Sequence, residues 1–234
     1  MDFGIRAFHR WYITDYFFIT ITETVIAMWI IGALLIALAI IVRIKLKKFK
    51  DVPETRFQNI VETIVETFDN FVTNTMTPKY AHFGNYFFGL FAFILLSNLS
   101  GLFGLRPPTA DFAMTYPLAL TTVILVQFMG IRYNMKKGEY LKEIFLRPVP
   151  IIFAPLNIIG EFSRSISLSL RLFGNIVGGL IVMSLIYSLF PWWLQLGPPG
   201  ALAIYFEFIV GALHAFIFVM LSMLFMMMKA PQTD

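Results

Sequence analysis

The chain of 234 residues is 58% hydrophobic and 14% charged, carries a formal net charge of +4 and contains no cysteine. Its apolar residues come in uninterrupted runs of about twenty, whereas helices on soluble proteins keep one polar face, so a large soluble core is excluded. We therefore expect an all-α integral membrane protein. Its positive charge then reflects topology and not a nucleic-acid partner, and disulfide or thiol chemistry is excluded.

Apolar segments long enough to cross a bilayer, which takes about 20 residues, occur at five places. They are residues 24–42, 83–105, 112–131, 165–190 and 200–228. Basic residues are concentrated directly after the first and the third segment, and cytoplasmic loops carry an excess of Lys and Arg. These residues are Arg43, Lys45, Lys47, Lys48 and Lys50, and then Arg132, Lys136, Lys137, Lys142 and Arg147. We therefore expect both loops and the C-terminus in the cytoplasm, and the N-terminus outside.

Residues 53–75 carry apolar side chains at helical spacing opposite a row of acidic ones, which predicts an amphipathic helix lying at the membrane interface. We expect a single membrane domain over residues 1–234. It comprises an N-terminal segment with the first span (1–50), the interfacial helix (51–78), a pair of spans (79–135) and a helix hairpin (150–229).

The hairpin begins with an unusually long helix, because residues 155–190 contain no helix breaker after the first turn. At 1.5 Å per residue this helix would be roughly 54 Å long, against a hydrocarbon thickness of about 30 Å. We therefore expect a long, tilted pair of helices at the C-terminal end of the chain.

Arg171 is the only charged side chain in residues 165–190. A charge at this depth costs at least about 2.5 to 3.5 kcal/mol on insertion scales, so it is tolerated mainly where it faces protein, water or an opposite charge. Small residues share its helical face, and such a strip lets another surface come close. They are Gly160, Ser163, Ser167, Gly174 and Gly178. The alternatives are a structural ion pair of Arg171, for example with Glu207, and static helix packing of the strip.

Glu207 and His214 lie seven residues apart in the last apolar segment, with Gly211 between them, so the spacing places all three on one helical face. A carboxylate and an imidazole inside a membrane can both exchange protons, which suggests part of a proton relay. In the alternative interpretation Glu207 is merely interfacial and His214 is a satisfied bundle residue.

The sequence around Arg171 resembles one known family. Its string SLSLRLFGN over residues 167–175, the Gly178-Gly179 pair and the later ALHAFIF over residues 212–218 are similar to the a subunit of F-type ATP synthases. The resemblance covers nearly the whole chain. It implies that Arg171 is the essential stator charge facing a rotating ring of c subunits. It also implies an outer half-channel lined by Asn175, Glu207, His214, Asn98 and Asp111, and an inner one near Asn157 and Glu161.

The chain departs from the family pattern at Gly179-Leu180, where many members carry Glu or His. This departure suggests that the relay has moved to Glu207 on the last helix. The chain lacks a G-x-x-x-x-G-K-S/T loop, so ATP chemistry would belong to partner subunits.

By resemblance we expect an ion-translocating stator subunit in the lipid bilayer of a bacterial inner (plasma) membrane, with no cofactor and no metal. Its partners would be the c-subunit ring, the b subunits of the peripheral stalk and the remaining ATP synthase subunits. The coupling ion, H⁺ or Na⁺, stays open. The alternatives are a secondary transporter, a passive channel or scaffold, and a redox-chain subunit.

Overall fold

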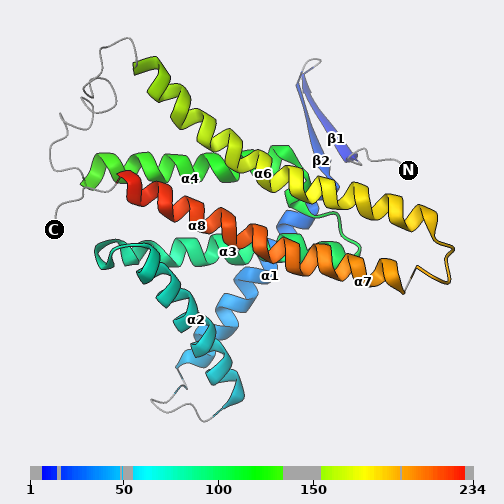
Figure 1. The fold of residues 1–234 in the computed structure, drawn as a ribbon, viewed down its shortest axis with the longest axis horizontal. Coiled ribbons are helices and arrows are strands. Elements are labelled where there is room, and N and C mark those ends of the chain that lie inside the picture. Colours follow the sequence, from blue (N-terminus) through cyan, green and yellow to red (C-terminus); the bar gives the residue numbers. More distant parts are fainter. Residues whose placement is uncertain are drawn as a thin grey trace.

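A computed structural model describes residues 7–14, 17–47, 49, 55–133, 154–195 and 197–229 of the chain. Its first feature is a short antiparallel hairpin, which the sequence analysis did not predict (Figure 1). Strand β1 (Ala7–Thr14) pairs with strand β2 (Phe17–Thr22). The β2 sequence, FFITIT, consists of aromatic and β-branched residues, which favour extended structure.

The remaining described elements are helical, and five stretches are long and apolar enough to cross a membrane, as predicted. The helices of these stretches are α1 (Glu23–Leu46), α3 (Gly84–Leu99), α4 (Phe112–Tyr133), α6 (Ala154–Leu189), α7 (Pro198–Ile204) and α8 (Gly211–Lys229). A π-helical turn over Tyr205–Val210 joins α7 to α8 into one continuous span. The long helix expected over residues 155–190 is confirmed, because α6 covers Ala154–Leu189.

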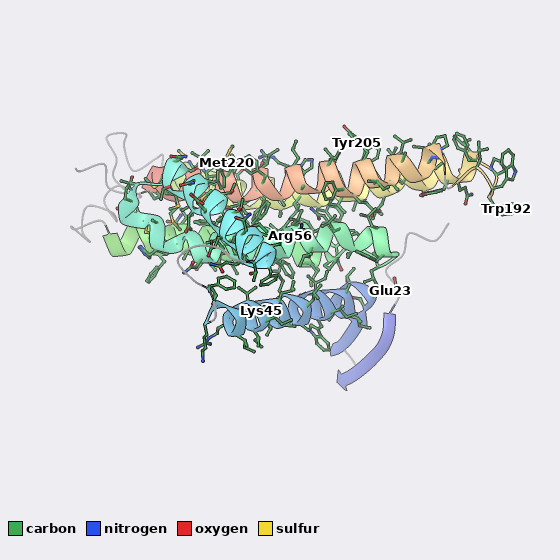
Figure 2. All side chains as sticks on the ribbon, turned by 90° about the horizontal axis from the view of Figure 1, so that it is seen from below. Glu23, Lys45, Arg56, Trp192, Tyr205 and Met220 are labelled. Atoms are coloured by element: carbon green, nitrogen blue, oxygen red, sulfur yellow. The ribbon has the colours of Figure 1, made fainter. Side chains whose placement is uncertain are left out.

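The spans are arranged in layers (Figure 2). Helix α1 forms one outer layer, α3 and α4 form the middle, and α6 with α7 and α8 forms the opposite outer layer. Glu23 and Trp192 lie at one end of the molecule, and Lys45 lies at the far end of α1. The basic residues expected at 48, 50 and 132–147 lie outside the part whose side chains are described.

The amphipathic helix predicted over residues 53–75 is present as α2 (Arg56–Thr75). Thr55 caps it by accepting a hydrogen bond from the Gln58 backbone at 3.2 Å. At its C-terminal end, Phe68 packs on Phe88 of α3 with ring centroids 5.1 Å apart, and Phe71 packs on Phe216 of α8 at 4.9 Å. Its N-terminal half leaves apolar residues exposed, as an interfacial helix requires.

The core lies where α3, α4, α6 and α8 meet. Its fully buried members include Phe87, Ile94, Ala119, Leu172 and Val219. The connection between α3 and α4 packs against this core through short 3₁₀ turns, Ser100–Phe103 and Pro108–Ala110. Because this connection carries several polar side chains into the bundle, it shapes the site described next.

Candidate functional site

Arg171 lies on the outward face of α6, away from the bundle. The helix buries Ser165, Leu168, Ser169 and Leu172 on its other side and packs mainly on α4. Arg171 itself is exposed. In the part of the chain that the structure describes, it forms no hydrogen bond or ion pair, so the alternative of a structural pair with Glu207 is not realised.

The small residues predicted to flank Arg171 share this open face. Ser163, Ser167, Gly160 and Gly174 are exposed, and Gly178 is half-buried. A methyl group built on Gly160, Gly174 or Gly178 would meet no atom within 4 Å. The strip therefore does not pack against another described helix of this chain and is free to meet an external surface.

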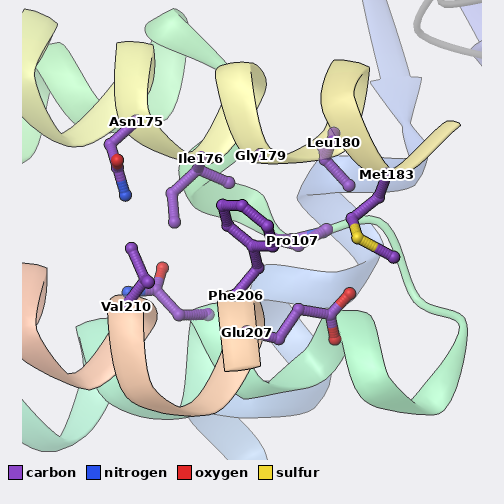
Figure 3. A pocket seen from close by; sticks show the side chains of 10 residues that line it. Pro107, Asn175, Ile176, Gly179, Leu180, Met183, Phe206, Glu207 and Val210 are labelled. Atoms are coloured by element: carbon purple, nitrogen blue, oxygen red, sulfur yellow. The ribbon is translucent and has the colours of Figure 1, made fainter. Parts of the chain in front are cut away.

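Glu207 lies in the π-helical turn and lines a cavity between that turn, α6 and the end of α3 (Figure 3). The lining includes Asn98, Pro107, Asn175, Leu180 and Glu207, and the space open to water-sized molecules is about 30 Å³. Such a volume holds about one or two waters. One carboxylate oxygen of Glu207, Oε2, is buried without a hydrogen-bond partner among the described residues. The cavity thus joins Asn175, Asn98 and Glu207, three of the predicted site residues.

Leu180 lies in the same cavity lining as Glu207. Leu180 of α6 and Glu207 of the π-helical turn therefore line one small space from two different helices. This proximity supports the suggestion from the sequence that the ionisable group of the relay has moved from residues 179–180 to Glu207 on the last helix.

His214 lies one turn beyond the π-helical segment, on α8. Its Nδ1 is buried without a hydrogen-bond partner among the described residues, and the charge of Arg171 acts on its ring. Glu207 instead contacts Gly101 at the end of α3. Because part of the π-helical segment lies between Glu207 and His214, the two side chains are not separated by uniform α-helical winding.

Asn98 is buried, and both polar atoms of its side chain form hydrogen bonds within the protein. Its Nδ2 donates to the Gly211 carbonyl at 2.8 Å, and its Oδ1 accepts from the Thr109 hydroxyl at 2.7 Å. Asp111 is similarly occupied. Its Oδ1 accepts from the Ala113 backbone at 3.0 Å, capping α4, and its Oδ2 accepts from the Thr24 hydroxyl at 2.9 Å.

Asn157 and Glu161, predicted for an inner half-channel, belong to the first turns of α6, but their side chains lie outside the described part of the chain. Conversely, the structure brings forward Gly101, Thr109 and Thr24, which the sequence analysis did not select. A glycine or threonine in an apolar segment is too common to stand out, and only their contacts reveal them.

The chain is similar to proteins of one known family. The family profile described as ATP synthase A chain matches residues 25–227. Subunit a of ATP synthase from Moorella thermoacetica is 35% identical over 205 residues, covering 87% of this chain and 88% of that protein. The corresponding subunit from Geotalea uraniireducens is 37% identical over 206 residues, covering 84% and 82%.

A third relative, the sodium-ion-specific subunit a of Propionigenium modestum, is 31% identical over 221 residues, covering 88% of this chain and 73% of that protein. The matched region contains the five spans except for two residues at the start of the first and two at the end of the last, together with the open strip around Arg171 and the cavity beside Glu207. The chain therefore belongs to the ATP synthase A chain family, as a multi-pass membrane protein that translocates ions in the stator of that enzyme.

Proposed function

We propose that Arg171 faces a ring of c subunits and separates an outer from an inner aqueous half-channel for H⁺ or Na⁺. The observation that carries this proposal is the outward, unpaired position of Arg171 on a strip of small residues. A charge within a membrane span that has no partner among the described residues needs an external one. The carboxylate of a rotating ring supplies the matching charge, and the open strip lets the ring approach.

Electrostatics then explains the coupling. A protonated, neutral rotor carboxyl travels through lipid at low cost, whereas an ionised one does not. Close to Arg171 the positive charge favours the ionised form, so the rotor group releases its ion there. The group is reloaded from the other half-channel as the ring turns. Arg171 also repels cations that would pass directly between the half-channels, so ion flow is obliged to turn the ring.

The outer half-channel would reach the ring through the cavity lined by Asn98, Asn175 and Glu207. In this path Glu207 exchanges protons, since it is the only carboxylate in the cavity lining and Oε2 has no protein partner among the described residues. His214, electrostatically coupled to Arg171, would stand between the cavity and the ring. Asp111 remains the candidate entrance carboxylate, and Asn157 with Glu161 the candidate inner group.

The end of the molecule that holds Lys45 would face the cytoplasm of a bacterial cell, and the end with Glu23 and Trp192 the outside. Other subunits of the ATP synthase are its partners. We assign the ring of c subunits to the face of α6 that carries Arg171. The b subunits of the peripheral stalk would bind elsewhere on the bundle.

The replacement Arg171→Ala tests the proposal in the assembled enzyme reconstituted in vesicles. We expect ATP synthesis driven by an ion gradient to fall to background, while the amount of assembled complex stays unchanged, because a small residue fits the strip. Arg171→Lys should not restore synthesis fully, since an ammonium reaches and hydrates differently from a guanidinium.

A matched control is Leu170→Ala, which removes bulk from a neighbouring exposed position, 49% exposed, without removing charge. This variant should keep most of the synthesis. Normal coupled synthesis by Arg171→Ala would reduce Arg171 to a packing residue and overturn the proposal.

A further inference from the structure

Two contacts join the region at the end of α3 to the last span: Gly101, in the 3₁₀ turn after α3, lies against the carboxyl group of Glu207, and Asn98 binds Gly211, directly after the π-helical turn. We propose that Gly101 and Asn98 form a seat for Glu207 that fixes where its carboxyl group exchanges ions, and that they act as positioning residues. This inference rests on the proposed role of Glu207 in the outer half-channel, and it adds the residues that set the position of the carboxyl group.

Gly101 makes room for the carboxyl group itself. A Cβ at this position would lie 2.7 Å from Cδ of Glu207 and 2.8 Å from each of its two oxygens. The backbone gives no other reason for a glycine, because Gly104 is the only described residue with a positive φ. The absence of a side chain at Gly101 is therefore explained by the carboxyl group that occupies its place.

Asn98 holds the backbone at the end of the π-helical turn, four residues beyond Glu207. Its amide donates to the carbonyl of Gly211, the first residue after the π-helical turn, and both groups are buried. A Cβ on Gly211 would approach Cβ of Asn98 to 3.0 Å, so the two helices are also in close contact here. Thr109 fills the other side of the amide and fixes its orientation.

These contacts give the seat a functional and not merely a structural character. Single π-helical turns inside α-helices are rare and are frequently found at functional sites. Asn98 anchors the C-terminal end of this turn and Gly101 receives its one acidic side chain. The seat thereby decides which side of the cavity the carboxyl group faces, and in Figure 3 that group points away from Asn175.

The decisive variant is Gly101→Ala, measured as ion flux through the whole enzyme in vesicles. The atoms that the new methyl group meets are the far end of a flexible side chain, so the fold tolerates the change while the carboxyl group must move. A displacement of about 1 Å at a reacting group can cost about 100-fold, and we expect flux to fall by about 10- to 100-fold with normal assembly. Gly89→Ala is the matched control, because a Cβ on that α3 glycine would meet nothing within 4 Å.

A compensating change separates positioning from packing. Glu207→Asp shortens the side chain by one methylene, so Gly101→Ala combined with Glu207→Asp should transport faster than Gly101→Ala alone. A parallel measurement on Glu207→Gln reports on the proposed half-channel itself. Blocked flux in Glu207→Gln together with full flux in Gly101→Ala would overturn the seat alone. Full flux in Glu207→Gln would overturn the role of Glu207.

Cross-linking tests the geometry without relying on flux. The chain has no cysteine of its own, so Gly101→Cys with Glu207→Cys gives a defined pair, and Gly89→Cys with Glu207→Cys gives its control. Only the first pair should form a disulfide under mild oxidation. Adding Asn98→Leu should lower that yield severalfold, because the π-helical turn loses its anchor. An unchanged yield with Asn98→Leu would remove Asn98 from the seat, and no cross-link in the first pair would overturn the proposal.

Discussion

Asp111 offers a prediction whose size follows from two hydrogen bonds. Its carboxylate caps α4 through Ala113 and binds the buried hydroxyl of Thr24 on α1. Removing the side chain in Asp111→Ala loses both bonds, including the one that links α1 to the start of α4. We therefore expect Asp111→Ala to destabilise the subunit, whether or not the carboxylate also receives ions.

The cap is partly exposed and contributes about 1 kcal/mol, the usual value for an N-cap. The bond from Thr24 to a carboxylate contributes about 1.5 kcal/mol, at the lower end for charged acceptors because it is only partly buried. The expected loss in free energy of unfolding is therefore about 2.5 kcal/mol.

Asp111→Asn should cost less than about 1 kcal/mol, since its amide oxygen can still cap α4 and its NH₂ can donate to Thr24. The hydroxyl of Thr24 can then turn to Thr22, whose oxygen is 2.8 Å away. The remaining loss is that of a negative charge at a helix N-terminus.

Reversible unfolding of the purified subunit in mixed detergent micelles would measure both losses, with Thr24→Val as a third variant that loses only the interhelical bond. The reasoning is refuted if Asp111→Ala and Asp111→Asn lose the same stability, or if neither loses any. Ion flux through Asp111→Asn enzyme then separates the roles. Retained flux identifies an anchor, whereas reduced flux with intact stability supports the entrance carboxylate predicted from the sequence.

Two further predictions concern the ion path and the topology. Glu207→Gln should lower ion flux by about 100-fold, the contribution typical of a proton-exchanging group. Adding Leu180→Glu should recover much of the flux, because both positions line one cavity. Equal recovery with Leu180→Glu and with the matched control Leu180→Gln would contradict this prediction. A cysteine replacing Lys45 should react with an impermeant reagent only from the cytoplasm and one replacing Trp192 only from outside, and the reverse pattern would invert the assigned orientation.

The spans, the amphipathic helix and the strip of small residues were predictable because their signals are local. Apolar runs of about twenty residues and a helical repeat need no knowledge of neighbours. The sequence predicted the strip of small residues around Arg171 but left static helix packing open as an alternative, and the exposure of Arg171 was found only in the structure. The hairpin of β1 and β2 was missed, although the FFITIT run of β2 has the residue types of a strand.

The partners of the polar residues could not be predicted, because they lie far away in the sequence. The hydrogen bond from Asn98 to Gly211 spans 113 residues, and that from Thr24 to Asp111 spans 87. The family resemblance assigned Asn98 and Asp111 to a channel but gave no hydrogen-bond partners for them. The shared face predicted for Glu207 and His214 assumed uniform α-helical winding, which the turn at Tyr205–Val210 interrupts.

The position of α6 also has a mechanical consequence. In the proposed arrangement, a ring that turns against Arg171 would push sideways on the middle of α6, a helix 36 residues long. On its buried side α6 packs on α4. Leu168 and Leu172 are buried in the core on this side, and the small side chains of Ser165 and Ser169 permit close approach. The force that the ring exerts on α6 would therefore act as shear at the contact between α6 and α4. This contact lies on the side of α6 that faces away from the ring. In this arrangement the buried contact between α6 and α4 would carry the mechanical load. The face of α6 proposed to meet the ring instead carries small residues, glycine and serine.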